Sequence, residues 1–301
     1  MRGIPYVQTS VFVDDRYPFG GNQLATYWDI DLNRTISTDD MQGMTLEMNF
    51  SESTFIERTE LKDCSFKVRI FTPASEIPFA GHPTLGTSFV LKYKNLIDQS
   101  VEKTILELGV GPIAVEYLDS KLIQMQQPSP KFEMTTDELT LITETIGLSP
   151  EDVDQEFPIQ PVSTGFPFLI VPLRDLATVK RAVPNPQLIL SNLKDLVSQE
   201  IVIFATEGVH KDSHVHMRMF APGAGVLEDP ATGSAAGPLG AYLEKYSVLS
   251  NHTIGEKIRI EQGYEMNRPS QLIVRVPNEK MEEVLVSGGT RLTAEGTFFL
   301  P

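Results

Sequence analysis

The sequence predicts an α+β protein made of two similar halves, and three observations lead to this prediction. The stretch "VRIFTP", beginning at Val68, returns as "MRMFAP" at Met217, and each copy runs through a loop into a Gly-rich turn and a helix. Strand-like segments dominate both halves, with too few helices between them for a doubly wound parallel sheet. A chain of 301 residues has room for two ordinary domains. We therefore expect each half to be a curled mixed sheet around one main helix.

The first half reads as strands interrupted by two helices. Thr38 is the expected N-cap of the first helix, which ends near Asn49. The second helix follows a loop at Gly81-His82-Pro83, where apolar residues recur at helical spacing. Alternation and β-branched content predict strands in "YVQTSVFVDD", "STFIER", "FKVRIFTP", "TILELG" and "PIAVEYLDSKLIQMQQ".

The second half begins after a polar, Pro-containing break at 126–132, the best linker candidate. Its first helix, "DELTLITETIG", ends at Gly147 as a C′ glycine, and its main helix is "AAGPLGAYLEKYS". "FPFLIVPL" and "EIVIFAT" are expected strands. We place one domain at 1–127, with 287–301 as a segment that can complete it, and the other at 128–286.

The composition excludes several classes of function. The net charge of −15 argues against nucleic acid as a partner, because phosphates require Lys and Arg. The single cysteine, Cys64, rules out intrachain disulfides and thiolate metal clusters, and suits a reducing cytoplasm. No stretch reaches the roughly 20 apolar residues of a membrane helix. We expect a cytoplasmic protein that acts on a small molecule and binds no membrane.

Two Gly-rich turns, "GHPTLGTS" and "DPATGSAAG", open helices and are candidate anion sites. The first backbone N–H groups of a helix lack intrahelical partners, and the dipole favours negative charge. Glycines that only let the chain turn are the competing explanation. Neither turn is a nucleotide motif, since Thr87 stands where a P-loop needs Lys. "GSAAG" is not G-x-S-x-G, so Ser234 has no nucleophile-elbow signature.

Four side chains near these turns could carry polar chemistry. His82 lies in one turn and Asp229 just before the other, so the two could face a common ligand. A structural or solvated histidine is the alternative for His82. His214 and His216 would share one strand face, but no third metal ligand is identifiable, and we predict no metal site.

Glu52, in "MNFSESTFIE", stands between a helix end and a strand, next to Phe50 and Phe55. An apolar pocket would raise the pKa of this carboxyl group toward the range useful for acid–base catalysis. On local sequence alone, a glutamate in a surface turn is the more common outcome.

Six long blocks of the chain, from about Phe19 to Leu300, form a recognisable set: "GGNQ", "EMNFSESTF", "IFTPASEIPFAGHPTLGT", "MFAPGAGVLEDPATGSAAGPL", "EQGYEMNRPS" and "VSGGTRLTAEGTFFL". Together they resemble the PhzF-like (phenazine biosynthesis-like) family. The resemblance implies the diaminopimelate-epimerase-like fold, in which two pseudo-symmetric α+β domains each roll a sheet around a central helix. It also implies an active-site cleft between the domains.

The same resemblance implies a role for each candidate residue. Glu52 would be the general acid/base that takes and returns a proton on a small cyclic substrate, without cofactor or metal. His82 and Asp229 would orient the substrate, and the binding of its carboxylate or ring substituents would fall to Gly81, Gly233 and Ser234. The implied reaction is the isomerisation of trans-2,3-dihydro-3-hydroxyanthranilate by a homodimer.

Related amino-acid racemases place a cysteine in each Gly-rich turn, whereas this chain has Ala80 and Asp229 near those places. A two-thiol racemase is therefore not expected. Gln23 and Pro230 depart from the family pattern and bear on the shape of the pocket. Two alternatives stay open: an epimerase or racemase of an amino or hydroxy acid, and a catalytically silent protein that binds a metabolite.

Overall fold

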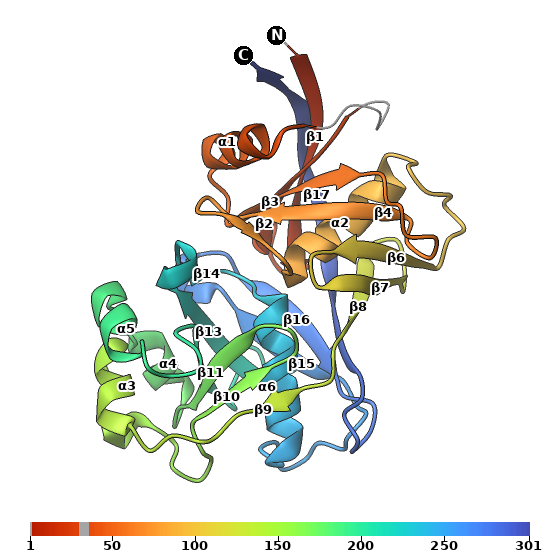
Figure 1. The fold of residues 1–301 in the computed structure, drawn as a ribbon. Helices are drawn as coiled ribbons and strands as arrows, with labels where there is room; N and C mark the ends of the chain where they lie inside the picture. Colours follow the sequence, from red (N-terminus) through yellow and green to blue (C-terminus); the bar gives the residue numbers. More distant parts are fainter. Residues whose placement is uncertain (1, 30–35) are drawn as a thin grey trace. The chain divides into compact units, whose positions relative to one another are not determined.

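A computed structural model describes residues 2–29 and 36–301, and its chain divides into two compact units (Figure 1). Unit 1 comprises residues 1–126 and 287–301, and unit 2 comprises 127–286. No helix in the described ranges is long and apolar enough to cross a membrane.

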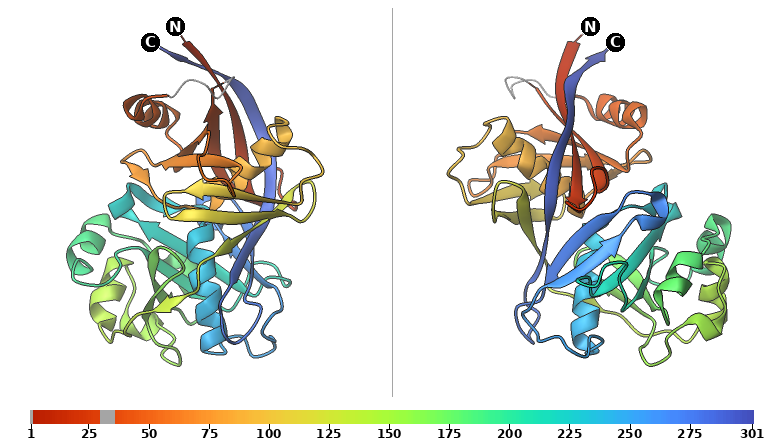
Figure 2. Two further views of the ribbon diagram at one scale, coloured as in Figure 1. Left: turned by 45° about the vertical axis from the view of Figure 1, so that its right-hand side comes forward. Right: turned by 180° about the vertical axis from the view of Figure 1, so that it is seen from behind.

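Unit 1 is a curled mixed sheet that encloses one central helix, α2. Its strands pair in the order antiparallel (β1–β2), parallel (β2–β3), antiparallel (β3–β4), parallel (β4–β6) and antiparallel (β6–β7, β7–β8). The last strand of the chain returns to pair antiparallel with β1, so both termini lie side by side (Figure 2). The elements are β1 (Arg2–Val13), β2 (Asn22–Trp28), α1 (Thr38–Met48), β3 (Glu52–Glu57), β4 (Phe66–Phe71), β5 (Glu76–Ile77), α2 (Gly81–Tyr93), β6 (Lys103–Leu108), β7 (Gly111–Tyr117), β8 (Leu122–Gln127) and β17 (Val284–Leu300).

Unit 2 repeats this pattern of pairings around its own central helix, α6. The order is antiparallel (β10–β11), parallel (β11–β12), antiparallel (β12–β13), parallel (β13–β15) and antiparallel (β15–β16). The elements are β9 (Lys131–Phe132), α3 (Leu139–Thr145), η1 (Pro150–Asp152), β10 (Gln160–Ser163), β11 (Pro167–Pro172), α4 (Leu176–Arg181), α5 (Pro186–Asn192), β12 (Ile201–Ala205), β13 (Val215–Ala221), η2 (Pro222–Ala224), β14 (Val226–Asp229), α6 (Gly233–Lys245), β15 (Ile258–Gln262), η3 (Tyr264–Met266) and β16 (Ser270–Arg275). The expected α+β class with two pseudo-symmetric halves is confirmed.

The repeated Arg-x-Phe phrase has the same structural role in both units. On β4, Arg69 forms a two-pronged ion pair with Glu76 and lies over the Phe71 ring at 5.1 Å. On β13, Arg218 pairs in the same way with Glu228 and lies over Phe220 at 5.0 Å. A guanidinium group can bind a carboxylate through two parallel hydrogen bonds while stacking on an aromatic face. The repeat therefore ties each strand to the short strand that leads into the central helix.

The central helices are enclosed because nearly every face of each is apolar or small. In α2, ten of the residues from Gly81 to Leu91 are buried, and α6 buries a similar run from Gly233 to Leu243. A helix that is apolar all round belongs in a core. The smaller helices α3, α4 and α5 form a separate core in unit 2 with Ile189, Leu169 and Ile201.

Two helix boundaries differ from the sequence prediction. Ser37, not Thr38, caps α1, because its hydroxyl accepts the Asp40 N–H at 3.1 Å. Helix α2 begins at Gly81, so Gly81-His82-Pro83 forms its first turn instead of a preceding loop. Pro is tolerated there because the N–H groups of the first helical turn have no intrahelical acceptors, so its missing N–H costs no helical hydrogen bond. The expected C′ glycine is confirmed at Gly147, with φ of 65°.

Candidate functional site

Glu52 is the first residue of β3, at the end of the sheet where helix α2 begins. It pairs in parallel register with Leu24 of β2, and its side chain is only 14% exposed. The interpretation of Glu52 as a glutamate in an open surface turn is therefore wrong. The aromatic neighbour Phe55 is buried in the core with Tyr27 and Phe71.

His82 is the second residue of α2, and its ring is buried beside Glu52. Its Nε2 lies 3.4 Å from Glu52 Oε2, and its side chain is 3% exposed. Burial lowers the pKa of His82 to about 3, outweighing a backbone contact at Gln23 that would raise it. The imidazole is therefore neutral at physiological pH.

Asn22, the first residue of β2, sets the direction of the His82 ring. Its Nδ2 lies 3.1 Å from His82 Nδ1, in a buried contact. An amide nitrogen donates and does not accept, so Nδ1 of the neutral ring is the acceptor here and the ring proton is on Nε2. Nε2 lies 3.4 Å from Glu52 Oε2 and makes no hydrogen bond within the described residues.

A buried chain of threonine hydroxyls fixes α2 against the strands that carry these residues. Thr87 of α2 donates to Thr54 of β3 at 2.8 Å, and Thr54 donates to Thr26 of β2 at 2.9 Å. All three side chains are buried. Satisfied polar networks in a core specify one arrangement of the elements that they join. The distance between Glu52 on β3 and His82 on α2 is set in this way.

In unit 2, Asp229 ends β14 and lies four residues before Gly233, the first residue of α6. Its carboxylate accepts a hydrogen bond from the Thr232 hydroxyl at 2.6 Å, and both residues are buried. Thr232 is the N-cap of α6. Gln262, at the end of β15, bonds the backbone and side chain of Thr232 and the backbone carbonyl of Asp229.

Gly233 and Ser234 are the first two residues of α6. The carbonyl of Gly233 accepts from Gln127 Nε2 at 2.9 Å, and Gln127 in turn accepts from the Thr164 hydroxyl at 2.6 Å. Ser234 is half-buried, whereas Gly233 is buried. The first turn of α6 is therefore held on one side by Gln127 and on the other by Gln262.

The repeat aligns residue by residue at the two helix starts. "EIPFAGH", from Glu76, occupies the same elements as "EDPATGS", from Glu228, and both segments lead from the short strand into the central helix. His82 therefore corresponds to Ser234, and Asp229 corresponds to Ile77. His82 and Asp229 therefore do not occupy equivalent positions in the two copies. The N-caps Ala80 and Thr232 correspond to each other, so Thr232, not Asp229, is the match to Ala80.

The structure brings Glu52, Gly81 and His82 together in unit 1, and Asp229, Gly233 and Ser234 together in unit 2. Their joint action across the two halves stays a prediction. Sequence reasoning missed the residues that hold them: Asn22, Thr232, Gln127 and Gln262. Two of these residues lie in the blocks that resemble the PhzF-like family: Asn22 in "GGNQ" and Gln262 in "EQGYEMNRPS". A buried amide has no periodic pattern that would single it out.

His214 and His216 do not form a metal site in the described residues. His214 Nδ1 accepts the backbone N–H of Arg259 at 3.0 Å. His216 lies between two carboxylates, at 3.4 Å from Glu261 and 3.1 Å from Glu265. In the parts of the chain that the structure describes, no group of three or more His, Cys, Asp or Glu is placed to hold a metal ion.

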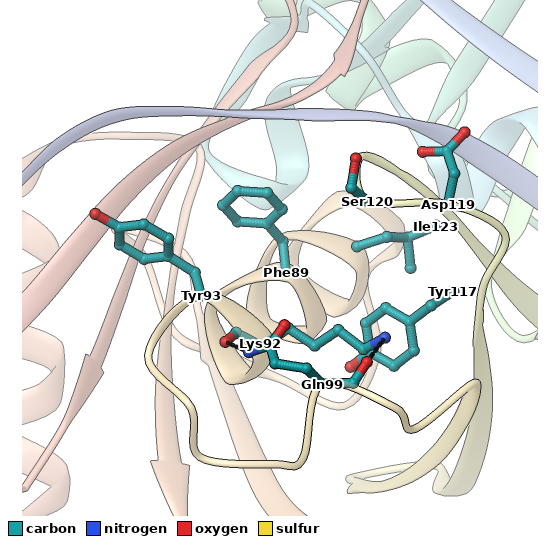
Figure 3. Close-up of a pocket in the computed structure, with 8 residues that line it drawn as sticks. All are labelled: Phe89, Lys92, Tyr93, Gln99, Tyr117, Asp119, Ser120 and Ile123. Carbon is teal, nitrogen blue, oxygen red and sulfur yellow. Dashed lines mark hydrogen bonds between the residues drawn. The ribbon is translucent and has the colours of Figure 1, made fainter.

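A pocket of about 470 Å³ lies elsewhere in unit 1, at the far end of α2 (Figure 3). Its one lysine, Lys92, is already engaged, with Nζ 4.1 Å from the centre of the Tyr117 ring and 3.1 Å from the Gln99 carbonyl. Neither Glu52 nor His82 lines this pocket, so it is not the candidate catalytic site. The lining residues are Phe89, Lys92, Tyr93, Gln99, Tyr117, Asp119, Ser120 and Ile123.

Comparison with known proteins adds a family and a fold. A family model described as phenazine biosynthesis-like protein (PhzC-PhzF) matches residues 10–296. Over 299 residues the chain is 36% identical to the trans-2,3-dihydro-3-hydroxyanthranilate isomerase of Pseudomonas aeruginosa, covering 98% of this chain and 99% of that protein.

Solved structures agree with this match. The crystal structure of the phenazine biosynthesis protein, PhzF family, from Bacillus anthracis covers 100% of both chains at 27% identity, with a TM-score of 0.87. A probable proline racemase from Agrobacterium radiobacter K84 has a TM-score of 0.67 at 9% identity, covering 99% of this chain and 93% of that one. At that identity the likeness shows a shared fold alone.

Proposed function

Since this chain belongs to the phenazine biosynthesis-like (PhzC-PhzF) family, we propose that it moves one proton between two carbons of a small carboxylated ring. The chain is an isomerase, as its curated relatives are named. The first candidate substrate is trans-2,3-dihydro-3-hydroxyanthranilate, the compound in the name of the Pseudomonas aeruginosa relative.

The observation that carries the mechanism is the buried contact between Glu52 and neutral His82, 3.4 Å apart. A carboxylate that is to remove a proton from carbon must be shielded from water yet reachable by substrate. Glu52 meets both conditions, because its side chain is 14% exposed at the end of a core strand. We assign it the role of general base and then general acid.

In this scheme one carboxyl group serves both proton transfers. Glu52 takes a proton from one ring carbon and returns it to another carbon on the same face of the ring. The substrate and product then have the same atoms, and no electrons enter or leave. The Nε2–H of His82 faces the same space and can donate a hydrogen bond to a substrate oxygen that gains charge in the transition state.

The starts of α2 and α6 are suited to the anionic groups of the substrate. The N–H groups of a first helical turn have no intrahelical acceptors, and no acidic residue lies in the first turn of either helix. We assign carboxylate or ring-substituent binding to Gly81, Gly233 and Ser234, and substrate orientation to Asp229.

An epimerase that inverts configuration with two bases fits less well. Such a mechanism needs a second acid–base group on the opposite face of the substrate. The equivalent N-cap positions of the two helices hold Ala80 and Thr232, and neither side chain titrates near neutral pH. A single-carboxylate isomerisation is therefore the better match to these residues.

The proposal is tested by turnover in D₂O followed by proton NMR. The protein is first treated with a chelator to remove metal ions. It is then mixed in separate samples with trans-2,3-dihydro-3-hydroxyanthranilate, with small cyclic amino acids, and with proline as a test of epimerisation. We expect the first compound to isomerise without added cofactor. Racemisation of proline with no isomerisation would replace the proposal by the epimerase alternative. Binding without turnover or deuterium uptake across the panel would support a silent metabolite binder instead.

A further inference from the structure

We propose that Gln262 is a positioning residue that holds Asp229 and the start of α6 in the arrangement that receives substrate. The inference rests on the proposed function, because it is the proposed reaction that gives Asp229 a role in binding. It also explains the "EQG" segment at Glu261-Gln262-Gly263, which the mechanism leaves without a role.

Both ends of the Gln262 amide are used on the loop that precedes α6. Its Oε1 accepts the Thr232 backbone N–H at 2.8 Å. Its Nε2 donates to the Asp229 carbonyl at 2.7 Å and to the Thr232 hydroxyl at 3.0 Å. Gln262 is 0% exposed, so water cannot replace these bonds when they are lost.

These bonds reach the Asp229 carboxylate through the Thr232 hydroxyl. The oxygen of the Thr232 hydroxyl accepts the hydrogen bond from Gln262. The single proton of that hydroxyl can therefore point at Asp229. It donates to Asp229 Oδ2 at 2.6 Å. The amide thus orients the hydroxyl, and the hydroxyl orients the carboxylate.

The residues on either side of Gln262 anchor the strand end that carries it. The Glu261 carboxylate is 0% exposed and accepts from the Val209 N–H at 2.6 Å and the Ser213 hydroxyl at 2.7 Å. Gly263 has φ of +81°, and a Cβ there would lie 2.4 Å from the carbonyl oxygen of Pro230. Only glycine permits this close approach to the residue that follows Asp229.

Gln160 offers a matched control in the same unit. It is also buried, and its amide also uses both ends, donating to the Glu133 carbonyl at 2.6 Å and accepting from the Tyr246 hydroxyl at 2.7 Å. It contacts none of the candidate site residues through these bonds. Gln160→Met therefore removes a comparable pair of buried bonds without touching Asp229.

The experiment compares Gln262→Met, Gln160→Met and wild type by hydrogen exchange and by turnover of trans-2,3-dihydro-3-hydroxyanthranilate. In Gln262→Met we expect amide exchange across 229–236 to rise about tenfold or more, and kcat/KM to fall about tenfold or more, because buried partners lose their bonds. In Gln160→Met, the exchange rate at 229–236 and kcat/KM should each stay within about twofold of the wild-type value.

A double-mutant cycle separates positioning from a general loss of structure. In an Asp229→Asn background, Gln262→Met should lower kcat/KM by a smaller factor than it does in wild type, because one of the groups that Gln262 positions is already altered. Full additivity of the two losses would overturn the inference, as would wild-type exchange at 229–236 in Gln262→Met. If Gln262→Met does not fold, Gln262→Asn replaces it, since that variant keeps a neutral amide but is one methylene too short to reach Thr232 and Asp229 in the same way.

Failure of the proposed function is distinguishable from failure of this inference. If wild type does not turn over the compound, the proposed substrate is wrong. The hydrogen-exchange measurement alone then tests whether Gln262 holds the loop before α6. Tenfold faster exchange confined to 229–236 would still support its role in holding the loop, and unchanged exchange would overturn it.

Discussion

Replacement of Glu261 by Gln should destabilise the protein in a way that depends on pH. Burial opposes the charged form of Glu261, but bonds from His216, Ser213 and the Val209 and His210 N–H groups outweigh it and lower its pKa from 4.5 to about 2. Burial would likewise lower the pKa of His216, but its bonds to Glu261 and Glu265 raise it.

The size of the effect follows from linkage. A carboxyl group with a depressed pKa contributes stability that is fully present above its unfolded pKa and is lost as the pH falls through its folded pKa. The difference between 4.5 and about 2 corresponds to about 3 kcal/mol at pH 7. At pH 3 the same relation leaves only about 1 kcal/mol.

Chemical denaturation followed by circular dichroism measures this directly. The gap in unfolding free energy between wild type and Glu261→Gln should narrow by roughly 2 kcal/mol from pH 7 to pH 3. Glu116→Gln, which alters a well-exposed pair with Lys103, is the control and should cost less than about 1 kcal/mol at either pH. A gap that stays constant between the two pH values would refute the reasoning, because it would show that the Glu261 charge is not what the fold requires.

Two further results are expected. Gly237→Ala should destabilise the protein by about 1–3 kcal/mol in thermal or chemical unfolding, since its Cβ would lie 1.8 Å from Gln127 Oε1. Gly43→Ala should be neutral or slightly stabilising, because beyond its chain neighbours and its own helix backbone no atom lies within 4 Å of the new Cβ. Equal effects of the two substitutions would contradict the packing described. In ¹⁵N NMR, His82 should stay neutral with its proton on Nε2 from pH 8 down to pH 5, given a pKa of about 3, and a titration near pH 6.5 would show that the ring is hydrated.

Much of the fold was predictable because a sequence repeat and regular apolar patterns mark its main strands and central helices. The Arg-x-Phe phrase marked β4 and β13, and the Gly-rich turns marked the starts of α2 and α6. Helices α4 and α5 escaped prediction because they have six and seven residues, too few for a helical period to stand out. Their caps, Asp175 and Asn185, and Pro186 at the first position of α5 were the local signals.

The candidate site was predictable only in part. Glu52 received its role through the family resemblance, since a lone glutamate after a helix has no local signature of burial, whereas His82 was singled out by its Gly-rich turn. Their contact depends on β3 pairing in parallel with β2 and on α2 packing across both, which is a long-range outcome. His82 and Asp229 both stood out in the sequence because each is a polar residue near a Gly-rich turn. Only the position of each helix start shows that Ser234 is the counterpart of His82.

The most direct test of the central claim is deuterium uptake by trans-2,3-dihydro-3-hydroxyanthranilate with Glu52→Gln. Glu57→Gln is the matched control, because Glu57 ends the same strand and its contact is Lys67, 3.8 Å away. We predict that Glu52→Gln lowers isomerisation and deuterium uptake by about 10²–10⁴-fold while Glu57→Gln retains wild-type rates. If Glu52→Gln isomerises the compound as fast as wild type does, Glu52 is not the group that carries the proton, and the proposed mechanism is wrong.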